Sequence, residues 1–355
     1  MRRTASSIVV TLALAAGAAT AAPAAAPAAT PQVDVWLVPW KNSRPRDPWV
    51  AADGKVWFCG QTGDYLARFD PLRAAREPGS AAAFELFPLD QGTGPHNLIL
   101  DAAGMVWYAG NRAAHIGRID PALFGKSGLG VGHTVKFAMP DPAATDPHTL
   151  VEDGKGGIWF TLQQSNKVGH LDKASGKVRL VDVPTPRSRP YGIWLDRAGH
   201  PWLNLLGTNA LATVDPKSLA LREVTLPRAE ARTRRIEVGP DGAVWAVDYG
   251  GGFLIRFDPA REGNADAFKE WALPGGAGSR PYGMAFDDRG RIWIAQSGDQ
   301  PNTMVAFDSR TGNFGAPFVI PEAHGAIRHM VFDAKRRELW FGTDTDRLVR
   351  VRLVD

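Results

Sequence analysis

The sequence has little cysteine: Cys59 is the only one among 355 residues, so no disulfide can form within the chain. An excess of charge of one sign is also lacking, because the chain has 41 lysine and arginine residues and 37 aspartate and glutamate residues. This near balance excludes the strongly basic surface that marks a nucleic-acid-binding protein. A composition of 44% hydrophobic and 22% charged residues excludes a disordered chain and a polytopic membrane protein. We therefore expect a soluble globular body.

The first 22 residues have the pattern of a secretory signal peptide. Arg2 and Arg3 precede an apolar run over residues 8–19, and Ala19-Thr20-Ala21 is a small-residue cleavage pattern. Prolines in the Ala/Pro-rich residues 23–31 disfavour a retained spanning helix, so we expect a disordered spacer there. Residues 32–355 are predicted to form a single domain. The protein is then periplasmic or secreted, with no membrane segment in the mature chain.

Internal repeats predict the architecture. The segment over residues 94–121 recurs at 146–173, 189–216 and 280–298, with weaker copies elsewhere. Each copy carries one tryptophan at the same point: Trp57, Trp107, Trp159, Trp202, Trp245, Trp293 and Trp340. A period of about 43–52 residues, with four short strand patterns in each unit, is typical of a propeller blade. The sequence therefore predicts an all-β fold, a seven-bladed β-propeller.

The two ends of the domain complement each other. The last unit has only three strand patterns and ends with residues 348–353, while residues 33–39 form an isolated strand pattern. Pairing the two would complete the seventh blade and close the ring, which removes both exposed sheet edges. The seven tryptophans are predicted to fill the space between adjacent blades, and Cys59 to be a small buried hydrophobic residue.

A ring of polar and aromatic residues is predicted at one mouth of the central channel. Counting back eleven residues from each tryptophan gives Arg46, His96, His148, Tyr191, Arg234, Tyr282 and His329. A second ring two residues earlier contains Arg44, Gly94, Asp146, Arg189, Arg232, Arg280 and Ile327. We expect the first ring to contact a ligand. We expect the arginines of the second ring, Arg44, Arg189, Arg232 and Arg280, to attract a carboxylate- or phosphate-bearing ligand. The alternatives are a solvated rim for the arginines and a structural hydrogen-bonding role for His329.

The repeat also resembles a known family. Residues 147–161 and their copies follow the pattern Pro-His-x-Leu, then Gly-x-Ile-Trp-Phe-Thr, and residues 116–119 read Ile-Gly-Arg-Ile. This unit is similar to that of the virginiamycin B lyase (streptogramin B lyase) family over essentially the whole mature chain. The resemblance implies a carbon–oxygen lyase that opens an ester or lactone by β-elimination. It also implies His148 as general base, His96 as a substrate contact and Asp146 as a ligand of Mg²⁺.

The chain departs from this pattern at the metal site. Asp146 is one methylene shorter than the family's glutamate, and Leu162 occupies the position of the second carboxylate, so any Mg²⁺ site should be weak or absent. Two functions stay open: a lyase acting on a cyclic ester, and a non-catalytic propeller that binds a ligand or protein at an anion-attracting mouth. Seven countable units disfavour a six-bladed lactonase. We expect a monomer whose partner is a small molecule, and the sequence does not identify it.

Overall fold

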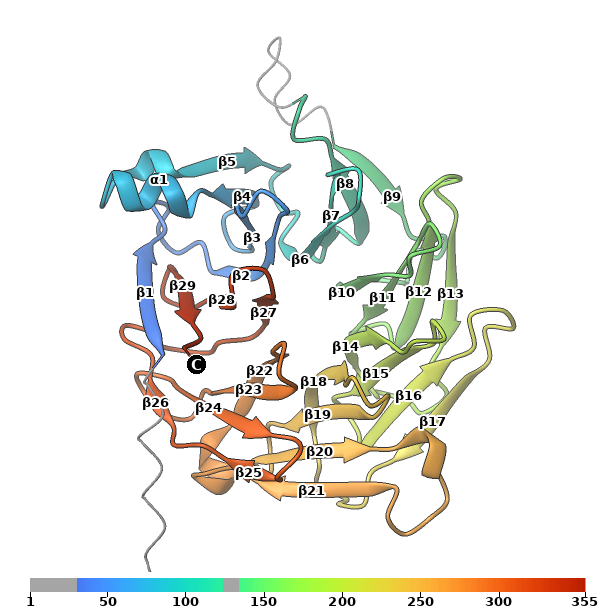
Figure 1. The fold of residues 1–355 in the computed structure, drawn as a ribbon. Helices are drawn as coiled ribbons and strands as arrows, with labels where there is room; N and C mark the ends of the chain where they lie inside the picture. The colour runs from blue at the N-terminus through green and yellow to red at the C-terminus, as the bar shows by residue number, and fades with distance from the viewer. Residues whose placement is uncertain (1–30, 124–133, 355) are drawn as a thin grey trace, which may run out of the picture.

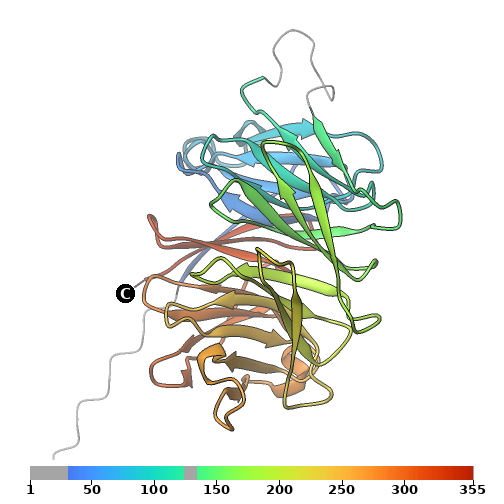
Figure 2. The same cartoon turned by 90° about the vertical axis from the view of Figure 1, so that its right-hand side faces the viewer.

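The computed structural model of the protein describes residues 31–123 and 134–354. It confirms the predicted fold: seven antiparallel sheets surround a central channel as the blades of a β-propeller (Figure 1). In each blade the first strand lies at the channel and the following strands lie progressively further out (Figures 1 and 2). The predicted leader (1–22), and the predicted spacer up to residue 30, lie outside the described residues.

The first four blades follow one another along the chain. Blade 1 contains β2 (Pro45–Val50), β3 (Val56–Gly60), β4 (Tyr65–Phe69) and β5 (Phe84–Pro88). Blade 2 contains β6 (Pro95–Leu100), β7 (Val106–Gly110), β8 (His115–Ile119) and β9 (Val135–Ala138). Blade 3 contains β10 (Pro147–Glu152), β11 (Gly157–Leu162), β12 (Lys167–Asp172) and β13 (Val178–Asp182). Blade 4 contains β14 (Pro190–Leu195), β15 (Pro201–Leu205), β16 (Ala210–Val214) and β17 (Leu221–Thr225).

The remaining blades complete the ring. Blade 5 contains β18 (Thr233–Val238), β19 (Val244–Asp248), β20 (Phe253–Phe257) and β21 (Phe268–Ala272). Blade 6 contains β22 (Pro281–Phe286), β23 (Arg291–Gln296), β24 (Thr303–Asp308), β25 (Asn313–Phe314) and β26 (Phe318–Val319), the last two both pairing with β24. Blade 7 contains β27 (Met330–Asp333), β28 (Glu338–Gly342), β29 (Arg347–Arg352) and β1 (Gln32–Leu37).

Strand β1 closes the propeller as predicted. It pairs with β29 over six residues in antiparallel register, with Val35 opposite Val349. The side chain of Asp34 accepts hydrogen bonds from Arg350 (3.0 Å) and Arg352 (3.2 Å) across the two strands. Trp36 stacks on Trp340 with ring centroids 5.6 Å apart. The two ends of the domain are therefore joined by backbone pairing and by side-chain packing.

The repeated tryptophans form the core between blades. All seven are at most 5% exposed, and each belongs to a separate apolar cluster shared with the following blade. Trp107 of blade 2, for example, packs in one cluster with Leu150 and Phe160 of blade 3. Cys59 is buried and free, as expected. Seven repeated interfaces thus hold the ring together without a disulfide among the described residues.

Short helices occupy several of the loops between strands. Helix α1 (Pro71–Arg76) begins after Asp70, whose carboxylate accepts hydrogen bonds from the backbone of Leu72 and Arg73. The described residues also form the 3-10 helices η1 (Ala81–Ala83), η3 (Pro259–Arg261) and η4 (Gly276–Ser279). None of the helices in the described part of the chain has the length and apolar character needed to cross a membrane.

Candidate functional site

An irregularity in the inner strands brings extra side chains to the channel. In blade 2, Pro95 pairs with Gly110 and Leu98 with Tyr108, so β6 carries one residue more than β7 between these two pairs. The same bulge occurs at the start of the inner strands of blades 1, 3, 4, 5 and 6. A bulge interrupts strict alternation, so neighbouring residues can both reach the channel. We call the channel end at which the inner strands begin the first mouth.

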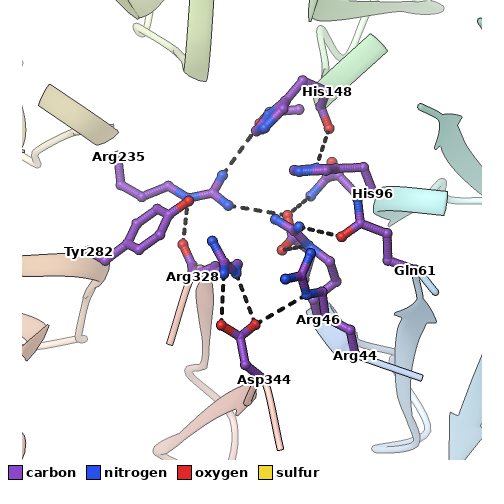
Figure 3. Close-up of polar contacts among 12 residues, drawn as sticks. Arg44, Arg46, Gln61, His96, His148, Arg235, Tyr282, Arg328 and Asp344 are labelled. Carbon is purple, nitrogen blue, oxygen red and sulfur yellow. Dashed lines mark hydrogen bonds and ion pairs between the residues drawn. The ribbon is translucent and has the colours of Figure 1, made fainter. Parts of the chain in front are cut away.

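Most of the predicted ring is buried at the first mouth. Five of its residues are at most 6% exposed: Arg46, His96, His148, Tyr191 and Tyr282. Arg234 and His329 are only partly buried. The structure thus brings His96, His148, Tyr282 and Arg46 together at the channel (Figure 3), and Tyr191 contacts both His148 and Tyr282.

The aromatic members form an arc of touching rings. The centroids of His96 and His148 are 3.6 Å apart, and those of His148 and Tyr191 are 4.0 Å apart. The hydroxyl groups of Tyr191 and Tyr282 are hydrogen-bonded to each other. The Arg234 guanidinium lies 4.7 Å from the ring centroid of Tyr282, a cation–π contact at the same mouth. The arc therefore offers flat, polarisable surfaces beside cationic groups.

Asp47 is the centre of a buried ion-pair network. Its carboxylate lies 3.0 Å from Nε of Arg46 and 3.3 Å from Nη2 of Arg235, and it accepts a hydrogen bond from Asn97 (3.0 Å). Burial alone would raise the pKa of Asp47, but the charges of Arg46 and Arg235 outweigh it and hold that pKa below its ordinary value. Asp47 is therefore ionised and links blades 1, 2 and 5 across the channel.

A second carboxylate anchors the mouth nearer to solvent. Asp344 accepts hydrogen bonds from Nε (3.0 Å) and Nη2 (2.7 Å) of Arg328, and Nε of Arg44 lies 3.4 Å away (Figure 3). The side chains of Arg44 and Arg328 are 43% and 22% exposed, so a ligand can approach them. The backbone oxygen of Arg328 accepts a hydrogen bond from Arg235 (2.7 Å), which connects the two carboxylate centres.

The two paired histidines are neutral. Burial, followed by the charge of Arg46, holds the pKa of His96 well below its ordinary value, and burial with Arg235 does the same for His148. Nδ1 of His96 faces the backbone oxygen of His148 at 3.2 Å and must donate, because a carbonyl oxygen only accepts. Nδ1 of His148 lies 2.9 Å from Oγ1 of Thr149. Nε2 of the neutral His96 ring is therefore an unprotonated base.

The surroundings of Asp146 do not fit Mg²⁺. The Asp146 carboxylate is hydrogen-bonded to the side-chain amide of Asn111, and burial raises its pKa to about 6. Leu162, at the position of the expected second carboxylate, is fully buried in the apolar cluster of Trp107. Within residues 31–123 and 134–354, no three His, Cys, Asp or Glu side chains gather into a metal-binding group.

The arginines of the predicted second ring are spread around the rim. Arg189 and Arg280 have exposed side chains, whereas Arg232 donates hydrogen bonds to the backbone oxygens of Ala229 and Ala231. Arg44, Arg189 and Arg280 share a left-handed backbone, with φ of 50°, 53° and 44°. Their carbonyl groups accept hydrogen bonds from the residues that follow the second strand of their blades. These positions are thus turn positions, and only Arg44 enters the ion-pair network.

Several central residues were not anticipated from the sequence. Asp47, Asn97, Thr149 and Arg235 stand ten residues before their tryptophans, next to the predicted ring, and the bulge turns them inward. Arg328 occupies the position at which five other blades have proline. The sequence signal that could have found the first four was the recurrence of polar residues ten positions before the tryptophan in four blades.

The fold and this site define a class: a seven-bladed propeller with a polar, arginine-rich cluster in its channel. The chain belongs to the virginiamycin B lyase family, whose sequence model matches residues 24–305. A comparison with curated protein sequences gave no match.

Solved structures agree with this assignment at the level of the fold. Virginiamycin B lyase from Staphylococcus aureus is 22% identical with a TM-score of 0.77, and the match covers 91% of this chain and 100% of that one. A catalytically inactive variant of that enzyme with quinupristin is 21% identical, with the same TM-score and coverage. The extracellular domain of a two-component system protein from B. thetaiotaomicron is 15% identical with a TM-score of 0.64, covering 91% of this chain and 43% of that one.

Proposed function

We propose that the protein binds a small anionic ligand at the first mouth. The observation that carries this proposal is an excess of positive charge: within residues 31–123 and 134–354, the guanidinium groups of Arg44, Arg46, Arg235 and Arg328 share only the carboxylates of Asp47 and Asp344. Nη2 of Arg46 is buried and has no hydrogen-bond partner among the described residues. A buried donor without an acceptor is costly, and a ligand oxygen would satisfy it.

The aromatic arc restricts the shape of the ligand. The rings of His96, His148 and Tyr191 lie beside the arginines, so a flat or cyclic body can stack there while its acidic group meets the guanidinium groups. We infer a ligand with a carboxylate or phosphate on a ring-containing body. Export belongs to the same proposal and is supported by the signal-peptide pattern of residues 1–22. We also propose a monomeric state.

Calorimetry with a matched pair of compounds tests anion binding. Benzoate and phenyl phosphate should bind and uncharged benzamide should not, and raising NaCl from 50 to 500 mM should weaken the anions because their attraction is partly screened. Arg328→Gln should weaken benzoate roughly tenfold, as expected for one lost charge-assisted hydrogen bond. The matched control is Arg310→Gln, on an exposed outer turn.

The pair Arg189→Ala and Arg280→Ala measures the contribution of the exposed rim. If these arginines help to attract the anion, the double variant should bind more weakly than either single variant. Equal binding of benzoate and benzamide, or no binding of either anion at low salt, would contradict an anion site.

A carbon–oxygen lyase activity is the second candidate, favoured by family membership and by the neutral histidine pair. In this reaction His148 or His96 takes a proton from the carbon next to a carbonyl group. The C–H electrons form a carbon–carbon double bond, and the C–O bond at the next carbon breaks to release a carboxylate. Arg46 and Arg235 would stabilise the developing negative charge. The tyrosines Tyr191 and Tyr282 would contact the substrate.

Mass spectrometry of a cyclic depsipeptide incubated with the protein separates the two candidates. Elimination opens the ring with no change of mass, whereas hydrolysis adds one water. If the protein is a lyase, His148→Ala should lower the rate by a factor of roughly 10² to 10⁴, as is usual for loss of a general base. His96→Ala should act on substrate affinity if it is only a contact, and on the rate if it is the base. An unchanged substrate would leave anion binding as the function.

A further inference from the structure

The far half of the channel contains a second candidate site. Two adjoining cavities of about 290 and 400 Å³ lie along the later parts of the inner strands, away from the first mouth. They share four lining residues from four blades: Trp49, Trp194, Glu237 and His329. Asn97 and Arg235, which both contact Asp47, also line the smaller cavity. Arg44 and Arg328, the more exposed arginines of the proposed anion site, do not line these cavities, so a ligand held at Glu237 would lie away from them.

Glu237 is the unusual group of these cavities. Its residue is only 9% exposed, and one carboxylate oxygen accepts a hydrogen bond from the backbone of Phe286 (3.1 Å). No ion pair to Glu237 is found among the described residues. Burial raises the pKa of Glu237 to about 8, because an ionised carboxylate would lack a counter-charge there.

The other charged groups of the cavities are already partnered. Arg235 binds Asp47, and Glu152 is paired with Lys173. Arg197 donates a hydrogen bond to the backbone oxygen of Pro240. His329 is neutral at physiological pH, because burial and then Arg235 lower its pKa to about 4. Arg197 has no ion pair among the described residues either, but its side chain is exposed. Glu237 is thus the buried carboxyl group of the cavities that lacks a partner of opposite charge.

The remaining walls are apolar and aromatic. Ile193, Ile236 and Met284 line the smaller cavity. Trp49 is partly buried and Trp194 is 39% exposed, so an indole ring is accessible where the cavities open. Aromatic faces beside a carboxylate attract cations, and apolar walls favour alkyl or aryl substituents.

We propose that this half of the channel binds a hydrophobic organic cation, an alkyl- or arylammonium group, with Glu237 as its counter-ion and Trp49 and Trp194 as its aromatic walls. A bound cation supplies the positive charge that the residues around Glu237 do not provide. Binding therefore requires the ionised form of Glu237, so it is coupled to release of a proton from this carboxyl group.

Calorimetry with benzyltrimethylammonium, whose charge does not depend on pH, tests the proposal. Affinity should rise roughly tenfold per pH unit between pH 6 and pH 8 and level off above, because the fraction of ionised Glu237 rises in this way. At pH 7, titrations in two buffers of different ionisation enthalpy should show release of close to one proton per bound cation.

Matched variants make the test specific. Glu237→Gln keeps an acceptor for the Phe286 amide, and it should weaken binding at pH 9 at least tenfold and abolish the pH dependence. Glu152→Gln, the other cavity carboxyl, should change affinity by less than twofold. Trp194→Leu, at a partly exposed position, should weaken binding and leave the melting temperature nearly unchanged. No binding at pH 9, or binding that is unaffected by Glu237→Gln in a folded variant, would overturn the proposal.

Discussion

Asp47 of blade 1 and Arg235 of blade 5 form an ion pair across the central channel, with 3.3 Å between Oδ2 and Nη2. Both side chains are almost fully buried, at 0% and 4% exposure. Asp47 has a left-handed backbone, with φ of 47°, which turns it away from the regular strand direction. The pair therefore depends on the bulges at the start of both inner strands, and it holds opposite parts of the ring in register.

Asp47→Asn should destabilise the protein by about 3–5 kcal/mol, because removal of one partner leaves buried positive charge without compensation. The charges left uncompensated are those of Arg46 and Arg235. Urea denaturation at pH 7 measures the loss. Asp344→Asn is the control, since Asp344 is 21% exposed and water can replace its carboxylate, so a smaller loss is expected. Equal losses in the two variants would contradict a central role for Asp47.

The paired histidines His96 and His148 should remain neutral at pH 5.5. Their pKa values are lowered by burial and nearby arginines, whereas unfolded histidine has a pKa of about 6.5. Below that pH the unfolded chain takes up protons that the folded protein does not. Each of the two histidines thus lowers the free energy of unfolding by roughly 1.4 kcal/mol per pH unit as the pH falls below the pKa of unfolded histidine. Nitrogen NMR should show neutral rings and the Nδ1–H tautomer of His96. A charged ring at pH 5.5 would contradict this geometry.

Glu237 should affect stability in the opposite direction. Its pKa is raised to about 8, so the folded protein holds a proton that the unfolded chain has lost above pH 4.5. Its contribution to stability therefore falls as the pH rises from about 5 to 8, by roughly 1.4 kcal/mol per unit at most. Glu237→Gln should remove this slope. The stability of the variant relative to the parent protein should therefore increase between pH 5 and pH 8. Parallel stability curves for the two proteins would show that the carboxyl group is ionised in the folded state.

Much of the fold could be predicted because each repeat carries a large residue, tryptophan, at the same position. Each tryptophan buries a wide ring at the same place in its blade, and the isolated strand pattern near the N-terminus needed a partner that the last unit lacked. The site was harder to predict. Offset counting found His96, His148 and Tyr282, but it assumed strict alternation along the inner strand. The bulges break that alternation, which is why Asp47 and Arg235 were missed.

Deleting residues 32–37 should greatly lower the melting temperature. The deletion removes the pairing of β1 with β29 and the stacking of Trp36 on Trp340, and it exposes an edge strand. A loss of several kcal/mol corresponds to roughly 10 °C for a domain of this size. Asp34→Ala, which removes only the partly exposed ion pairs with Arg350 and Arg352, should change the melting temperature by about 2 °C or less. Calorimetry of a truncated protein that melts like the parent would rule out closure by β1.

Leu162→Glu examines the metal site that the family resemblance implies. The substitution restores a carboxylate three residues after Trp159, but Leu162 is fully buried among apolar neighbours in the cluster of Trp107. A carboxyl group there loses its hydration, and Asp146 is already hydrogen-bonded to Asn111. We expect a destabilised protein, by several kcal/mol, whose melting temperature does not rise with Mg²⁺. Leu162→Met, of similar volume, should cost less than about 1.5 kcal/mol. A folded Leu162→Glu variant that Mg²⁺ stabilises and that opens a cyclic depsipeptide faster than the parent would show instead that the family's metal chemistry is one substitution away.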